Sequence, residues 1–185
     1  KSDDCMFAKS GVPEKLWESM AYSTLNGGKR IRPVLLLAAT EAVGGSLEDA
    51  LPAACAIELI HTQSLIHDDL PAMDNDVWRR GKPSNHVVFG DAVAIVAGDA
   101  LLCYAFQILA ENPPVHLSTP RVLDVIAEMA YAAGGDGMCG GQVLDMLAEG
   151  APGLSVEQLE HLYCLKTGRL IRGAIRMGAI LGDCS

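Results

Sequence analysis

The sequence predicts an all-α fold, and three observations support this prediction. Half of the 185 residues are apolar but only 5% are aromatic, a composition typical of closely packed helices rather than of a β-sandwich. No segment alternates apolar and polar residues between turn signals, as a half-buried strand would. Helix-capping and helix-breaking residues instead divide the chain into apolar stretches of helical length. The length suits one globular domain with a sizeable core.

The N-terminal half is expected to hold three helices and a loop after an irregular segment over 1–12. Asn-Gly-Gly ends the first helix, and Gly-Gly ends the second. Ser46 and Asp49 form an N-cap signal, and Pro52 is placed to start the third helix at its first turn. The predicted helices cover 13–25, 34–43 and 52–66, and a charged, proline-containing loop covers 70–86.

The C-terminal half is expected to be helical throughout, with short breaks. Thr119 is predicted as an N-cap followed by a proline at the first helical position. Ser155 and Gln158 match a capping box, which predicts the start of the last helix. The predicted helices cover 92–111, 119–133, 139–148 and 155–181.

Charge and cysteine content exclude several classes of protein. The net charge of −9 argues against a nucleic-acid partner. The six cysteines include no Cys-x-x-Cys pair, so we expect free thiols and neither a zinc site nor a disulfide framework. The most membrane-like stretch, 87–110, is interrupted by Asp91 and Asp99. A carboxylate in mid-span is costly in a bilayer, so we expect a buried helix and no transmembrane segment.

Cationic residues gather in three short segments of this acidic chain. The first two segments are Lys29, Arg30 and Arg32, and Arg79, Arg80 and Lys82; the third holds Lys166, Arg169, Arg172 and Arg176. Clustered cations in an acidic protein are suited to an anionic ligand such as a diphosphate, whose oxygens can accept from several donors. Solvated charges at helix ends are the alternative interpretation of each cluster alone.

An aspartate-rich segment follows the third predicted helix. Four carboxylates, Asp68, Asp69, Asp74 and Asp76, lie within nine residues and repel one another unless water or a cation neutralises them. Mg²⁺ takes carboxylate oxygens and keeps waters or phosphates as its other ligands. Asp68 and Asp74 can converge only if the chain bends between them, and Pro71 is placed to cause that bend. A solvated acidic loop is the alternative.

His61 is predicted to share a helix face with Asp68, because seven residues return almost to the same side of an α-helix. A lone histidine on an apolar helix is usually a core residue. Its phase with the acidic segment favours a functional role instead.

Three motifs together carry a resemblance to a known family. They are Asn-Gly-Gly-Lys-Arg-Ile-Arg-Pro at 26–33, Glu-Leu-Ile-His-Thr-Gln-Ser-Leu-Ile-His-Asp-Asp-Leu-Pro-Ala-Met-Asp-Asn-Asp at 58–76, and Arg-Arg-Gly-Lys-Pro-Ser-Asn-His at 79–86. The chain resembles the trans-isoprenyl diphosphate synthases, specifically the farnesyl and geranylgeranyl diphosphate synthases, over 13–182. The shorter motifs Gly-Asp-Ala-Leu-Leu, Gly-Gln-Val-Leu-Asp and Lys-Thr-Gly follow in the family's order.

The resemblance implies a helical bundle around a central cavity and a Mg²⁺-dependent condensation of isopentenyl diphosphate with an allylic diphosphate. It implies that Asp68 and Asp74 hold the metal, with Asp69 and Asp76 as weaker candidates. It places isopentenyl diphosphate on Lys29, Arg32, His61 and Arg80. It places the allylic diphosphate on Arg79, Lys166 and Thr167, with Lys166 also counted among the catalytic residues. Gln142 and Asp145 would face the cavity, with a helix-packing role as the alternative for Asp145. Asp99 would be a structural residue bonded within the bundle.

Product length, assembly and compartment are also implied by the resemblance. Gln63 and Ser64 replace aromatic residues before Asp68, which favours a product longer than C15, with C20 expected. The family implies a homodimer or a heteromer, and a plastid or a bacterial cytoplasm as the compartment, with the plastid favoured.

The sequence departs from the family in its C-terminal part. The second aspartate-rich motif of the family is absent from the sequence, so residues 13–185 are expected to form the N-terminal and central part of the synthase domain without its C-terminal helices. Arg169, Arg172 and Arg176 recur at helical spacing where the family is usually apolar. This stripe faces either water or an acidic partner. The alternative function is therefore a non-catalytic subunit of a larger complex.

Overall fold

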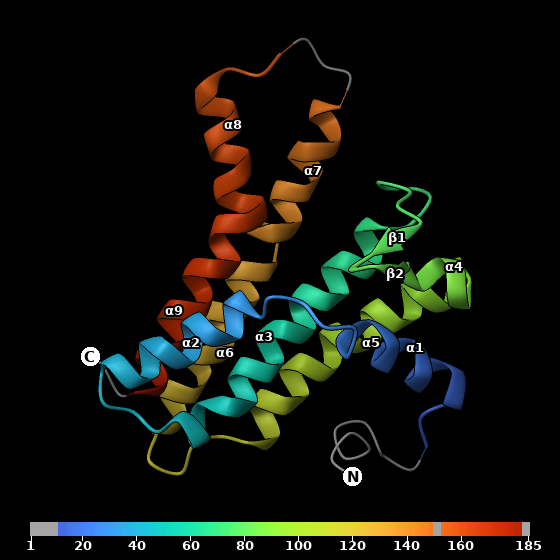
Figure 1. Cartoon of the computed structure of the whole chain (residues 1–185). Helices are drawn as coiled ribbons and strands as arrows, with labels where there is room; N and C mark the ends of the chain where they lie inside the picture. Colours follow the sequence, from blue (N-terminus) through green and yellow to red (C-terminus); the bar gives the residue numbers. More distant parts are fainter. Residues whose placement is uncertain (1–10, 150–152, 183–185) are drawn as a thin grey trace. The chain divides into compact units, whose positions relative to one another are not determined.

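The computed structural model describes residues 11–149 and 153–182, and it confirms an all-α fold with one small hairpin (Figure 1). The helices are α1 Glu14–Thr24, α2 Ile31–Ala42, α3 Leu47–Asp68, α4 Asn85–Phe89, α5 Asp91–Glu111, α6 Thr119–Ala133, α7 Met138–Ala148, α8 Val156–Tyr163 and α9 Arg169–Leu181. A π-helical turn, η2 Cys164–Gly168, joins α8 to α9. The predicted last helix is therefore continuous and contains a π-helical segment. The predicted irregular segment 1–12 lies mostly outside the described residues.

Helix α3 begins earlier than predicted, because Ser46 and not Pro52 starts it. The Ser46 hydroxyl accepts a hydrogen bond from the Asp49 backbone N–H at 3.3 Å, as the N-cap signal indicates. Pro52 lies inside the helix, where it leaves the carbonyl of Glu48 without its usual helical donor. Glu48 is exposed, so water can satisfy that carbonyl.

The loop predicted over 70–86 contains a hairpin that was missed. Strands β1 Trp78–Arg79 and β2 Lys82–Pro83 pair antiparallel, with Trp78 opposite Pro83. Arg80 and Gly81 both have positive φ, as a two-residue hairpin turn requires. Strands of two residues are too short to show an alternating pattern, so periodicity could not reveal them.

Of two other predicted caps, one moves by a residue and one is confirmed. The N-cap of α6 is Ser118, one residue before the predicted Thr119, and its side chain makes no capping hydrogen bond. The capping box of α8 is confirmed in both directions, with Ser155 and Gln158 bonded at 2.9 and 3.2 Å.

The chain divides into two compact units, and α3 and α5 each contribute to both. The first unit holds the described part of Lys1–Lys29 with Leu59–Tyr104. Its core includes Ile60, Ala97 and Leu101, and α1 packs on α4 through an edge-to-face contact of Tyr22 and Phe89 at 5.6 Å.

The second unit holds Arg30–Glu58 and the described part of Ala105–Ser185. Helix α9 packs on both α2 and α6, and α7 packs on η2. Leu36, Met129, Leu170 and Met177 are fully buried in this core.

Helix α5 is the one helix among residues 11–149 and 153–182 that is long and apolar enough to cross a membrane, by length and composition only. The helix was predicted to be buried, but only 33% of its most apolar window is buried. Ile95 and Val96 are 44% and 51% exposed. Asp99 was predicted to be bonded within the bundle. Its side chain is 66% exposed, and its Oδ1 lies 4.0 Å from His67 Nε2 of α3.

Candidate active site

The end of α3 shapes the turn that carries the two predicted metal ligands. Asp68 is the last residue of α3, and its carbonyl accepts a hydrogen bond from the Asp74 backbone N–H at 2.9 Å. The Leu70 carbonyl accepts from Met73 at 2.9 Å and from Asn75, which has a φ of 52°, at 3.1 Å. The chain therefore bends after α3, as the spacing of Asp68 and Asp74 required, and the bend joins the two residues through their backbones.

Asp69 is almost fully buried and is held by Arg79. The Asp69 side chain is 3% exposed, and Arg79 Nε donates to its two oxygens at 2.9 and 3.2 Å. Arg79 Nη2 also donates to Asp69, and it reaches Asp76 at 3.3 Å. The hydrogen bond to Asp69 raises the pKa of Arg79. Asp69 and Asp76 thus orient an arginine, and their roles as weaker metal candidates stay predictions.

Arg79 keeps one nitrogen for a ligand. Nε and Nη2 are occupied by carboxylates, whereas Nη1 has no partner among the residues that the structure describes. The side chain is 31% exposed. Nη1 is therefore the Arg79 nitrogen that can donate to the predicted diphosphate.

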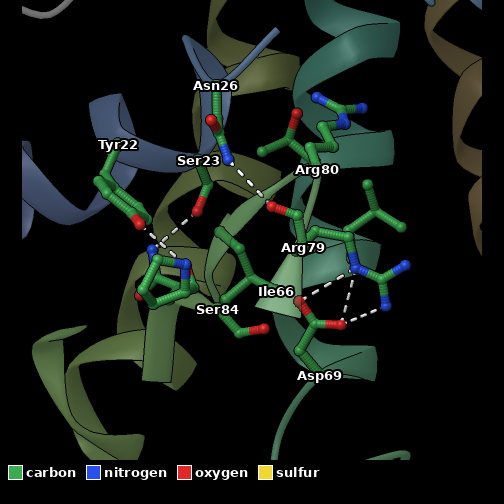
Figure 2. A pocket seen from close by; sticks show the side chains of 12 residues that line it. Tyr22, Ser23, Asn26, Ile66, Asp69, Arg79, Arg80 and Ser84 are labelled. Carbon is green, nitrogen blue, oxygen red and sulfur yellow. Dashed lines mark hydrogen bonds and ion pairs between the residues drawn. The ribbon is translucent and has the colours of Figure 1, made fainter. Parts of the chain in front are cut away.

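Arg80 lies against the glycine-rich segment before α2. Its Nη1 donates to the Gly27 carbonyl at 2.6 Å. Gly28 has a φ of 113°, and a Cβ there would lie 2.5 Å from Arg80 Cζ. The positive φ favours glycine at this position, and a larger residue would also have to displace the Arg80 guanidinium. Asn26 donates to the Arg79 carbonyl at 3.3 Å, which ties the same segment to the hairpin (Figure 2).

A small cavity of about 20 Å³ lies beneath these arginines in the first unit. Asn26, Asp69, Arg79 and Arg80 line it on one side (Figure 2). The buried hydroxyls of Thr62 and Ser84 also line it and have no partner among the described residues. The volume suits about one water molecule.

The other predicted residues of the first unit are Lys29 and His61. Lys29 is exposed beside Gly28, and His61 is half-buried on α3. Ser64 donates to the His61 carbonyl at 2.8 Å. The first unit therefore brings together the aspartate-rich turn, the hairpin arginines and the glycine-rich segment.

Arg30 of the first cation cluster is paired with a buried glutamate. It donates to Glu58 at 2.6 Å, and the Glu58 side chain is 8% exposed. Both residues belong to the second unit, as does Arg32, which is half-buried in α2.

Lys166 forms a close pair with Asp145 in the second unit. Lys166 Nζ lies 2.5 Å from Asp145 Oδ2, and the two side chains are 24% and 38% exposed. Lys166 lies in the π-helical turn η2, and a Cβ on Gly141 would lie 2.1 Å from the Lys166 backbone nitrogen. The absence of a side chain at Gly141 lets α7 approach η2, and π-helical turns are frequent at functional sites. Thr167 is exposed, and Gln142 is half-buried on α7.

The arginine stripe of α9 is partly engaged within the second unit. Arg176 Nε lies 2.9 Å from Glu128, and the Arg169 guanidinium lies 5.2 Å from the centre of the Tyr131 ring. The helical spacing of the stripe is confirmed, and these two members stabilise contacts between α9 and α6.

Comparisons with known proteins assign the family. The family model described as polyprenyl synthetase matches residues 13–185. The chain belongs to the polyprenyl synthetase family. This confirms the resemblance to the isoprenyl diphosphate synthases and the all-α synthase fold.

Individual relatives agree with this assignment. The chain is 49% identical over 92% of its length to a geranylgeranyl diphosphate synthase of Cyanophora paradoxa and covers 57% of that protein. It is 51% identical over 92% of its length to a farnesyl diphosphate synthase of Geobacillus stearothermophilus, again covering 57%. The crystal structure of an FPP/GFPP synthase from Zymomonas mobilis matches with a TM-score of 0.89 and 44% identity, over 94% of this chain and 64% of that one. The chain thus spans about half the length of its curated relatives.

Proposed function

We propose that the protein acts in a prenyltransferase that condenses isopentenyl diphosphate with an allylic diphosphate. Membership of the polyprenyl synthetase family and relatives named geranylgeranyl and farnesyl diphosphate synthases support this activity. The observation that carries the proposal is the turn after α3, where a backbone hydrogen bond of 2.9 Å joins the two aspartates of the motif beside a half-buried, oriented arginine.

We propose Asp68 and Asp74 as the residues that hold Mg²⁺. Asp68 is half-buried and Asp74 exposed, so both donor groups lie at the surface of the turn. No group of three or more metal-ligating side chains occurs in the described parts of the chain. Two carboxylates fit Mg²⁺, which commonly binds proteins through one or two carboxylates and keeps waters and phosphate oxygens as further ligands. Bound Mg²⁺ would neutralise charge on a departing diphosphate.

The basic side chains of the first unit supply the donors for the substrates. Arg79 Nη1 points a fixed donor, held by Asp69, toward an incoming phosphate oxygen. Lys29 and Arg80 flank the glycine-rich segment, where backbone can approach a ligand closely. Within the first unit, we assign isopentenyl diphosphate to Lys29, His61 and Arg80, and the allylic diphosphate to Arg79. The roles of Arg32, Lys166 and Thr167, which belong to the second unit, stay predictions from the family resemblance. Asp145 orients Lys166 through their ion pair, and Gln142 contributes a neutral donor.

Replacing Asp68 tests the metal assignment. Asp68→Ala should lower the Mg²⁺-dependent condensation rate more than about a hundredfold, because stabilisation of developing charge is usually the largest catalytic contribution in such sites. The rate is measured as transfer of labelled isopentenyl diphosphate into an acid-labile product. Asp91→Ala, an exposed aspartate of the same unit at the start of α5, is the control and should keep its activity. Retained turnover in Asp68→Ala would refute the assignment.

Replacing Lys29 tests the separation of the two substrate sites. Lys29→Ala should raise the KM for isopentenyl diphosphate by about ten- to a hundredfold, the value of one hydrogen bond to a charged group. The KM for the allylic substrate should change little. Lys15→Ala, an exposed lysine on α1, serves as the control. An equal rise of both KM values would contradict separate sites.

The product and the assembly are also part of the proposal. We propose geranylgeranyl diphosphate as the product, because Gln63 and Ser64 are smaller than aromatic residues.

We propose a dimer in which a second subunit covers α5, since Ile95 and Val96 leave an apolar face of that helix in water. Light scattering of the wild type and of Val96→Asp measures this assembly, and a wild-type monomer would contradict it. The relatives include chloroplastic and bacterial proteins, and the plastid stays a prediction.

A further inference from the structure

His67 immediately precedes Asp68, and its ring is held at both nitrogens. Nε2 lies 3.1 Å from the Ile95 carbonyl oxygen of α5, and Nδ1 lies 3.0 Å from the Gln63 side-chain nitrogen one turn earlier on α3. A carbonyl oxygen can only accept, so Nε2 carries a proton and donates it. In the neutral ring Nδ1 then accepts from the amide of Gln63. One tautomer thus satisfies both contacts.

The ring also fits a space that a glycine leaves on α5. A Cβ on Gly98 would lie 2.1 Å from His67 Nε2 and 2.5 Å from its Cδ2. Any side chain at this position would displace the ring and break its hydrogen bond to Ile95. His67, Ile95 and Gly98 all belong to the first unit, so the contact lies within one compact body.

This contact lies next to the backbone that shapes the aspartate-rich turn. The His67 carbonyl accepts from Leu70 at 3.2 Å, and the Asp68 carbonyl accepts from Asp74 at 2.9 Å. The last turn of α3 therefore begins the bend that carries both carboxylates. Because the His67 ring is fixed to α5, it sets the orientation of the last turn of α3. The directions of the Asp68 and Asp74 side chains depend on that orientation.

We propose that His67 is a positioning residue for the metal site, which acts by anchoring the end of α3 to Ile95 and Gly98 of α5. The proposal rests on the proposed function, in which Asp68 and Asp74 hold a divalent cation. His67 itself contacts neither the metal nor a substrate. Its effect is on the geometry of the two aspartates, and therefore on metal affinity.

Binding of Mn²⁺ in the presence of inorganic diphosphate tests this role without turnover. The electron paramagnetic resonance signal of free Mn²⁺ gives the Kd directly. His67→Leu removes both hydrogen bonds and should weaken Mn²⁺ by about tenfold, as loss of a group that orients metal ligands commonly does. His67→Gln places an amide N–H the same number of bonds from the backbone as Nε2. It should keep the hydrogen bond to Ile95 and bind Mn²⁺ as the unaltered protein does.

Gly98→Ala provides a second route that leaves His67 in place. Alanine favours a helix more than glycine does, so α5 itself should not be weakened. The added Cβ should nevertheless displace the ring and weaken Mn²⁺ to a similar extent. In a His67→Ala background the ring is gone, and Gly98→Ala should then cause no further loss of affinity. Such non-additivity is expected only when the two residues act through one contact.

Asp68→Asn separates failure of this inference from failure of the proposed function. If Asp68→Asn binds Mn²⁺ as tightly as the unaltered protein, the metal site itself is wrong. If Asp68→Asn loses Mn²⁺ while His67→Leu and Gly98→Ala bind it normally, the positioning role of His67 is wrong. Equal losses of Mn²⁺ affinity in His67→Gln and His67→Leu would also overturn it, because the donor to Ile95 would then be irrelevant. Circular dichroism of each variant confirms that α3 and α5 are formed.

Discussion

The two compact units hold their functional cations by different means. In the first unit, Arg79 is fixed by direct hydrogen bonds to Asp69, whose side chain is almost fully buried. In the second unit, Lys166 lies in a π-helical turn that comes close to α7 only because Gly141 has no side chain, and its partner Asp145 is more than a third exposed. A buried charge network orients the first cation, whereas the second combines a partly exposed ion pair with close helix packing at a glycine.

This difference predicts which kind of substitution damages each unit. The first unit should be sensitive to loss of a charged partner, because a buried carboxylate or guanidinium without its partner is costly. The second should be sensitive to added volume at its helix contacts, because packed helices cannot easily separate. Three pairs of stability measurements test this difference between the units.

The largest expected effect concerns the buried pair of the first unit. Asp69→Ala leaves Arg79 partly buried without its partner and should lower the free energy of unfolding by about 3 kcal/mol. This value is at the low end for buried pairs because 31% of the Arg79 side chain stays in water. Urea unfolding followed by circular dichroism measures the change.

Asp76→Ala is the matched control for this prediction. Asp76 contacts the same arginine at 3.3 Å, but its side chain is 58% exposed. Removing it should cost less than about 0.5 kcal/mol, as for most exposed ion pairs. Equal losses for Asp69→Ala and Asp76→Ala would show that burial does not decide the strength of this network.

The next effect concerns the contact of α2 with α9 in the second unit. A Cβ on Gly178 would lie 2.2 Å from the Leu36 carbonyl oxygen, which is rigid backbone. Gly178→Ala should therefore push the two helices apart and lower the free energy of unfolding by about 2 kcal/mol, despite the better helix propensity of alanine. Thermal and urea unfolding both report it.

Gly168→Ala gives the comparison for volume alone. Its Cβ would meet the Tyr163 carbonyl oxygen at 3.6 Å, an ordinary contact distance. This variant should be as stable as the wild type or slightly more so. If Gly168→Ala lowered the free energy of unfolding as much as Gly178→Ala, replacement of a helical glycine would itself be harmful. The close contact at Gly178 would then not explain the loss.

Local signals in the sequence predicted much of the fold. Caps and breakers act within a few residues, so the ends of most helices could be placed from neighbouring positions. The capping box of Ser155 and Gln158 is such a case, since both partners lie within one turn. Pro52 shows the limit of local rules, because the cap at Ser46 starts α3 and the proline is tolerated inside the helix.

The partners of the candidate site residues could not be predicted in this way. The Asp69–Arg79 pair depends on a hairpin whose strands are only two residues long, and the Lys166–Asp145 pair depends on the packing of two helices. The contact of His67 with Gly98 joins residues that lie 31 positions apart on different helices. Such pairs follow from tertiary packing, which spacing along one element does not determine. The aspartate-rich motif itself was recognisable because its carboxylates lie within nine residues.

The smallest effect lies at the start of α8, where no charge network or tight glycine contact is involved. Ser155→Ala removes the hydroxyl that accepts from the Gln158 backbone N–H, and should lower the free energy of unfolding by about 1 kcal/mol. Ser118→Ala is the matched control, because Ser118 is also an exposed N-cap of the second unit but its side chain makes no capping hydrogen bond. Ser118→Ala should lower the free energy of unfolding by no more than about 0.5 kcal/mol. Urea unfolding of both variants gives the difference, and equal values would show that the capping box of α8 adds nothing to the stability of the second unit.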